Sequence, residues 1–67
     1  MNSKDFLDCV NDARFDKKIG SYFRWHLKEV LEKRSKLPSG TRNFILSSAL
    51  MCAGEMMKEN EDIRATE

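Results

Sequence analysis

The residues best suited to chemistry in this chain are two cysteines and one histidine. Cys9, Cys52 and His26 are its only thiols and its only imidazole. A nucleophilic cysteine needs a histidine, a third group to orient it and a substrate cleft, and a structural zinc site needs four ligands. The spacing contains neither a C-x-x-C nor an H-x-x-x-H motif. We therefore expect no enzymatic activity, no cofactor and no metal site, with His26 either a core residue with its polar atoms satisfied or a half-exposed residue of the core.

Basic side chains concentrate in the middle of the chain. From Arg14 to Arg42, nine lysines and arginines stand against three acids, a local charge of +6, whereas the whole chain carries +1. Two interpretations stay open, a solvated helix face with i,i+4 ion pairs or a surface that binds phosphates. A nucleic-acid interface would use Lys17, Arg24, Lys28, Lys33, Arg34 and Arg42.

Trp25 is the most informative aromatic residue. With 100° per residue, it falls outside the apolar stripe that contains Phe23 and Leu27, so the indole is expected to be partly exposed. Tyr, Trp and Arg are the types that dominate binding hot spots, and they are adjacent here. The alternative is that the first helix or the acidic end of the chain covers the ring. An exposed Trp25 predicts a partner-binding surface made of Tyr22, Arg24, Trp25 and Lys28.

The expected helix that contains Phe44 and Met51 is apolar over more of its circumference than one packing partner can cover. Phe44 and Met51 lie on the side of their expected helix opposite Ile45 and Cys52. Either two other helices cover them from two sides, or they stay free as an interaction surface. In the second case the chain can form a homodimer through Phe44, Met51 and Met56, because methionine adapts to irregular surfaces.

Three helical segments are expected to position these residues. The first begins after Ser3, a predicted N-cap, and keeps an apolar face through Ala13. The second runs from about residue 16 to residue 36, although Gly20 weakens its first turn and makes Ser21 an alternative start.

A break and a third helix complete the pattern. Pro38 and Gly40 stop the second helix and reverse the chain. The third helix is predicted to begin at Thr41, which can cap it, and to run to residue 60 or 62. These segments predict an all-α fold, a small three-helix bundle in which the short first helix packs on an antiparallel helical hairpin.

The size and the composition bound the remaining possibilities. A chain of 67 residues forms one domain, 1–67, with a thin core, and residues 61–67 are expected to fray. The chain starts without a signal-peptide pattern and has no apolar run of about 18 residues, so we expect a cytoplasmic protein without a membrane partner. Two cysteines in helical patterns are expected to remain reduced.

One segment resembles a known DNA-binding family. The run from Phe23 to Leu31 resembles the strand-to-helix entry of ribbon-helix-helix repressors, and residues 41–57 resemble their second helix, so the resemblance spans residues 23–57, about half of the chain. The resemblance implies a short strand that reads DNA. The sequence departs from that pattern, because the helical period from Ile19 continues through the run and Pro38 cuts the next helix short.

These patterns favour a small, non-enzymatic regulatory or adaptor protein. It would bind a partner protein through the aromatic and basic face of its second helix. The alternative is a nucleic-acid-binding regulator that uses the basic residues of that helix, as a homodimer if the third helix associates with itself. Pull-down with and without nuclease separates the two.

Overall fold

The computed structural model describes residues 2–66 and contains four helices. These are α1 (Ser3–Val10), α2 (Ala13–Ile19), α3 (Ser21–Leu31) and α4 (Ser39–Thr66). No strand occurs within the described residues. The all-α prediction is therefore confirmed, but the number of helices differs from the three that were predicted.

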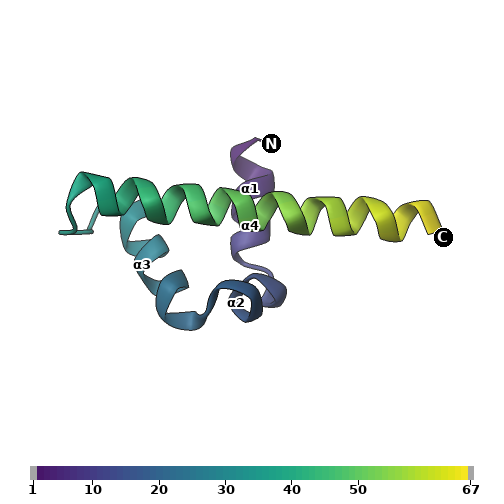
Figure 1. Cartoon of the computed structure of the whole chain (residues 1–67), viewed down its shortest axis with the longest axis horizontal. Coiled ribbons are helices and arrows are strands. Elements are labelled where there is room, and N and C mark those ends of the chain that lie inside the picture. The colour runs from purple at the N-terminus through teal and green to yellow at the C-terminus, as the bar shows by residue number, and fades with distance from the viewer. Residues whose placement is uncertain (1, 67) are drawn as a thin grey trace.

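The long helix α4 organises the molecule. Its 28 residues correspond to about 42 Å at 1.5 Å per residue, close to the 44 Å length of the whole molecule. The helices α1, α2 and α3 all contact α4. Figure 1 shows α1 crossing α4 steeply near its middle, with α2 and α3 on one side, while the C-terminal end of α4 extends beyond them. The arrangement is a scaffold helix with three short helices packed against it.

Side-chain caps start the first two helices. The Oδ1 atom of Asn2 accepts a hydrogen bond from the backbone N–H of Asp5 at 2.8 Å, so the cap of α1 lies one residue before the predicted Ser3. The Oδ1 atom of Asp12 accepts from the N–H of Arg14, also at 2.8 Å, and starts α2. This second cap makes residues 13–19 a separate helix.

Gly20 divides the expected second helix into α2 and α3. Its φ of +94° and ψ of 143° lie where residues with a Cβ are strained. Its N–H donates to the carbonyl of Asp16 at 2.8 Å, and its own carbonyl accepts from the N–H of Arg24 at 3.0 Å. One glycine thus ends one helix and begins the next, which explains why four helices form instead of three.

The helix α3, which corresponds to the later part of the predicted second helix, ends before the predicted end at residue 36. It stops at Leu31, and Lys33 has a φ of +58°, the left-handed conformation that commonly follows a helix end. The N–H of Arg34 donates to the carbonyl of Glu29 at 2.9 Å, and the N–H of Lys33 donates to the carbonyl of Val30 at 3.1 Å. Residues after Leu31 therefore fold back beside α3.

The final helix is longer than predicted at both ends. It begins at Ser39, before the predicted cap Thr41, and continues to Thr66. Residues 61–66 are helical and exposed, and their fraying stays a prediction. The run from Phe23 to Leu31 is helical, so the strand implied by the ribbon-helix-helix resemblance is absent and that resemblance does not hold. Within residues 2–66, no helix is both long enough and apolar enough to cross a membrane.

The core lies where the three short helices meet α4. Phe15, Leu27 and Met56 are its largest fully buried side chains. Half of the ten buried apolar residues come from α4, because Ala49 and Ala53 let the short helices approach its backbone closely. Among residues 2–66 the buried apolar side chains are Phe6, Cys9, Val10, Phe15, Leu27, Ile45, Ala49, Cys52, Ala53 and Met56.

Candidate functional site

The exposed face of α3 carries an aromatic cluster. Leu27 is fully buried against the core, which turns the opposite side of the helix to solvent. On that side Tyr22 is 78% exposed and Trp25 is 57% exposed. The prediction of a partly exposed Trp25 is confirmed, and the alternative in which other helices cover the ring is wrong.

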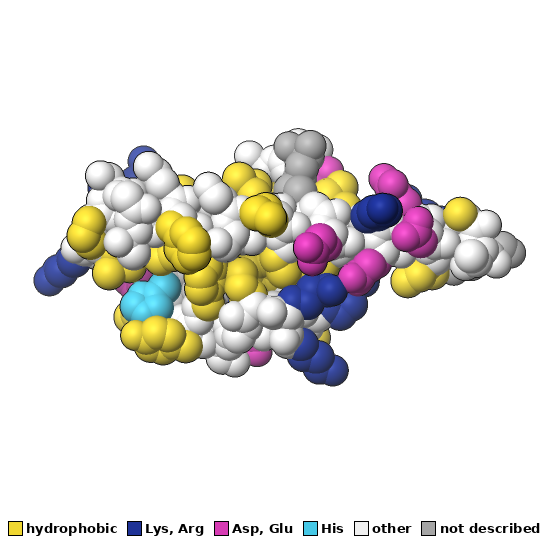
Figure 2. Space-filling model, in the orientation of Figure 1, with side chains coloured by type: hydrophobic (Ala, Val, Ile, Leu, Met, Phe, Trp, Pro, Cys, Tyr) yellow, Lys and Arg dark blue, Asp and Glu magenta, His cyan; other side chains and the backbone are white. Residues whose placement is uncertain are grey.

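His26 joins the two exposed rings into one surface. Its imidazole lies 4.5 Å from the ring centroid of Tyr22 and 5.0 Å from that of Trp25, both in edge-to-face geometry. Such arrangements are favourable aromatic contacts and limit ring movement. His26 is half-buried, as predicted for a residue beside the core. Figure 2 shows the histidine in cyan with hydrophobic side chains in yellow next to it.

A hollow of about 300 Å³ opens beside this cluster. The aromatic rings of Trp25 and His26 and the side chain of Leu37 supply its apolar wall, and polar residues supply the rest. Such a hollow accepts one large side chain of a partner more readily than a whole small molecule. Its lining residues are Trp25, His26, Glu29, Arg34, Ser35, Lys36 and Leu37.

Local hydrogen bonds hold the shape of the hollow. The Arg34 guanidinium lies 3.8 Å from the carboxylate of Glu29 and also pairs with Glu32. The Ser35 hydroxyl accepts a hydrogen bond from the N–H of Leu37 at 3.2 Å. The i,i+4 pairs Lys28–Glu32 and Glu29–Lys33, which the sequence suggested, do not form. Arg34 takes both carboxylates because the positive φ at Lys33 turns the chain back toward α3.

The predicted partner-binding residues do not form one surface. Tyr22 and Trp25 lie on the aromatic side, but the Nε of Arg24 donates to the carbonyl of Val10 at 2.9 Å, at the end of α1. Lys28 lines a different hollow, of about 330 Å³, between α1 and α3. Residues 24 and 25 point about 100° apart on the helix, so Arg24 and Lys28 belong to the α1 side. The four-residue grouping is corrected to the aromatic pair with His26.

The six residues predicted for nucleic-acid binding are dispersed. Two of them already have protein partners, since Arg24 binds the backbone of α1 and Arg34 pairs with two carboxylates. The remaining four are exposed and lie on different elements, namely Lys17 on α2, Lys28 on α3, Lys33 in the following loop and Arg42 on α4.

The predicted self-association residues also separate. Phe44 is 66% exposed and Met51 is 71% exposed, so neither is covered by two helices as the alternative required. Met56 is fully buried in the core. Met56 belongs to the same core cluster as Phe15, so the prediction that it takes part in an association surface is corrected.

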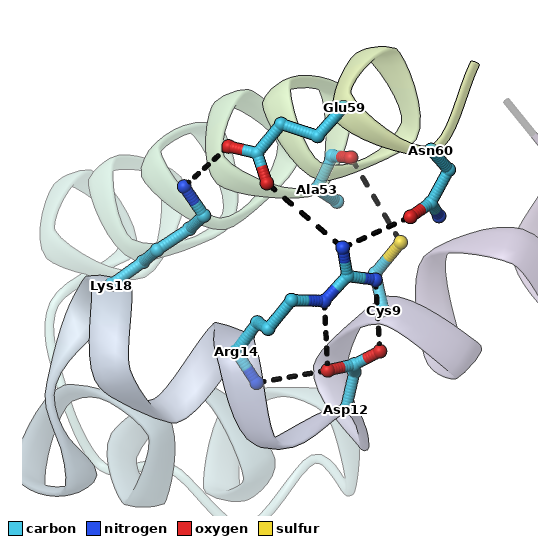
Figure 3. A network of polar contacts seen from close by, with 7 residues as sticks. All are labelled: Cys9, Asp12, Arg14, Lys18, Ala53, Glu59 and Asn60. Carbon is cyan, nitrogen blue, oxygen red and sulfur yellow. Dashed lines mark hydrogen bonds and ion pairs between the residues drawn. The ribbon is translucent and has the colours of Figure 1, made fainter. Parts of the chain in front are cut away.

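A polar network that the sequence did not reveal joins α2 to the distal half of α4. Arg14 donates to both carboxylate oxygens of Asp12, from Nε at 3.2 Å and from Nη2 at 3.0 Å, and to Oδ1 of Asn60 at 2.9 Å. The Nζ of Lys18 lies 2.7 Å from Glu59. Figure 3 shows these side chains converging between the two helices. The network fixes the direction of α4 relative to α2.

The electrostatics of this network are those of a structural contact. The hydrogen bonds from the side chain and the backbone of Arg14 lower the pKa of Asp12. The hydrogen bond to Glu59 raises the pKa of Lys18. Asp12 and Lys18 are therefore ionised at neutral pH, and each already has a partner. The only local signal available is an aspartate at position 12 that can cap a helix. The contacts of Arg14 with Asn60 and of Lys18 with Glu59 join residues more than 40 positions apart, so local patterns do not predict them.

The two thiols are buried and poorly suited to nucleophilic chemistry. Burial raises the pKa of Cys9 and of Cys52, so both stay protonated at neutral pH. The Sγ atom of Cys9 lies 3.9 Å from the carbonyl of Ala53, where it is a weak donor between α1 and α4. Both cysteines are free. Within residues 2–66, no three histidine, cysteine or acidic residues are placed to hold a metal ion.

Comparison with known proteins identifies no relative: no family model, no curated protein and no solved structure matches this chain.

Proposed function

We propose that this chain is a small, non-enzymatic regulatory or adaptor protein that docks on a partner protein through α3. The observation that carries the proposal is the exposed pair Tyr22 and Trp25, braced by His26, beside the hollow that reaches Leu37. Exposed aromatic rings held in place lose little conformational entropy when they bind, which favours their use as anchors.

The chemistry of the hollow favours a particular kind of partner segment. Its apolar wall of Trp25 and Leu37 suits one bulky apolar side chain. Lys36 lines the same hollow and has no ion-pair partner among the described residues. We therefore propose a partner segment that presents an apolar anchor next to an acidic residue. Binding would act by occupying that segment.

The test begins with proteins captured from the native host by the wild type. Phe44→Ser is the matched control for Trp25→Ala, because Phe44 is an exposed aromatic residue on a different helix. A partner of the α3 surface is lost with Trp25→Ala and retained with Phe44→Ser. With the purified partner, loss of a hot-spot residue should weaken binding by about 2 kcal/mol, roughly 30-fold.

Fluorescence supplies an independent readout, because Trp25 is the only tryptophan. Docking on this surface should shift its emission to shorter wavelength as the ring leaves water. Binding that leaves the emission unchanged and survives Trp25→Ala would refute the proposal. Capture that nuclease abolishes, with affinity falling steeply as salt rises, would instead establish nucleic-acid binding by the dispersed basic residues.

A further inference from the structure

A second exposed apolar surface lies on α4. Phe44 and Met51 are separated by seven residues, so they project from the same face of the helix. Both are more than half exposed, and Ser48 lies between them. None of these residues lines the hollow beside Trp25, so this surface is independent of the α3 cluster.

A groove lies next to this face, with a volume of about 230 Å³. Four of its lining residues, Ser48, Met51, Cys52 and Glu55, have the i, i+3, i+4, i+7 spacing of the hole that receives a knob in helix packing. Lys18 and Ile19 of α2 close one side. The surface therefore contains an apolar knob, Phe44, and a hole in the same helix.

We infer that a second copy of this chain occupies this surface, with the two α4 helices packed antiparallel. Phe44 of each copy enters the groove of the other, which makes the contact self-complementary, as a two-fold dimer requires. Because the groove is centred near residues 51 and 52, the two-fold axis passes close to residue 48. The small side chains of Ser47 and Ser48 at that point let the helices approach closely.

The charges favour the antiparallel direction. With the two-fold axis at residue 48, Glu55 of one copy lies opposite the first turn of α4 in the other copy. That turn contains no acidic residue, and a helix N-terminus attracts negative charge. Glu55 has no ion pair within residues 2–66. A parallel pair would instead place Glu55 beside Glu55.

Sedimentation equilibrium tests the association. The wild-type mass should rise with concentration from 7.8 kDa toward twice that value, while Phe44→Ser stays at the monomer mass. Tyr22→Ser is the matched control, since it removes an exposed aromatic ring from α3 and should dimerise like the wild type. Circular dichroism verifies that each variant remains helical. A wild type that is still monomeric at about 1 mM, or a Phe44→Ser variant that dimerises equally, overturns the inference.

A cysteine cross-link tests the geometry. Near the two-fold axis, Ser48→Cys should form a disulfide between copies under mild oxidation, because paired Cα atoms there fall near the required spacing of about 4.4–6.8 Å. Ser3→Cys, exposed on α1, is the control that should not cross-link at the same concentration. Rapid cross-linking of Ser48→Cys that Phe44→Ser suppresses supports the antiparallel pair. Equal cross-linking of the two cysteine variants overturns it.

Discussion

Two regions of this small molecule use large aromatic residues in opposite ways. Phe15 of α2 is fully buried against α4, and the network around Arg14 and Glu59 covers that corner. Trp25 of α3 is 57% exposed and touches His26 beside an open hollow. A thin core would gain from burying every aromatic ring, so an uncovered tryptophan is a loss of available stability. The α2 corner, made of Phe15 and the contacts of Arg14 and Lys18 with α4, thus maintains the fold, whereas the aromatic side of α3 stays open to solvent, as the proposed docking requires.

The largest loss of stability is expected for a substitution in the α2 corner. Phe15→Ala should lower the free energy of unfolding by about 3–5 kcal/mol, because it removes a fully buried ring. A domain of this size has only about 3–10 kcal/mol in total, so the variant should be largely or wholly unfolded at 37 °C. Thermal and urea denaturation followed by circular dichroism measure the change.

Two exposed positions serve as controls for that substitution. Phe44→Ala removes the same ring from a site that is 66% exposed, and at low protein concentration it should change stability by less than about 1 kcal/mol. Trp25→Ala should behave alike. If Trp25→Ala destabilised the protein as much as Phe15→Ala, the division between a structural corner and a binding surface would be wrong.

An intermediate effect concerns the glycine that separates the two regions. Gly20→Ala should destabilise the protein by about 1–3 kcal/mol, because its φ of +94° is strained for alanine. Gly54→Ala should instead stabilise it by about 0.5–1 kcal/mol, since Gly54 is within α4 and an added Cβ meets no atom within 4 Å. Equilibrium denaturation of both variants gives the two signs.

Opposite signs would show that the joint between α2 and α3 depends on backbone conformation and not on space. Gly20→Ala has open space as well, with no atom within 4 Å of the added Cβ. A stabilising Gly20→Ala would mean that the two helices can merge into one without loss, contrary to the arrangement described.

The smallest effect expected is the pH dependence of the stability that the Asp12 carboxylate contributes to the α2 corner. Arg14 lowers the folded-state pKa of Asp12 below its ordinary value of 3.8, so the ionised carboxylate contributes stability above that value. This contribution should decline as the pH falls below 3.8 and through the lowered pKa. Asp12→Asn keeps an N-cap residue and lacks the charge. The difference in Tm between wild type and Asp12→Asn should therefore shrink from pH 6 to pH 2, and a constant difference would exclude the carboxylate as its source.

Local patterns predicted the features that depend on neighbouring residues in the sequence. Helical periodicity identified the all-α class and placed Trp25 outside the buried stripe. The same periodicity set Phe44 and Met51 apart from the buried side of α4. These properties follow from the angle between successive residues on a helix, which the sequence contains directly.

The features that were missed depend on single backbone angles or on distant contacts. Gly20 was recognised as a weak helix residue that could move the start of the second helix to Ser21, and α3 does begin there. The positive φ of Gly20, which lets residues 13–19 form a separate helix α2, was not predicted. Arg24 looked solvent-facing by periodicity, and its bond to Val10 depends on where α1 comes to lie. Met56 was assigned to the surface because the depth of the core around α4 depends on all three short helices.

The position of α4 at the end of the described chain also has a consequence for the order of folding during synthesis. Ile45, Ala49, Cys52, Ala53 and Met56 supply half of the buried apolar residues, and α1, α2 and α3 all pack on them. A nascent chain that ends before residue 45 contains the segments of α1, α2 and α3 but not the surface on which they pack. Helices of 8, 7 and 11 residues are too short to persist alone in water. The segment before α4 therefore cannot complete its core until residues 45–56 of α4 are available, and Phe15 and Leu27 have no burial site before then.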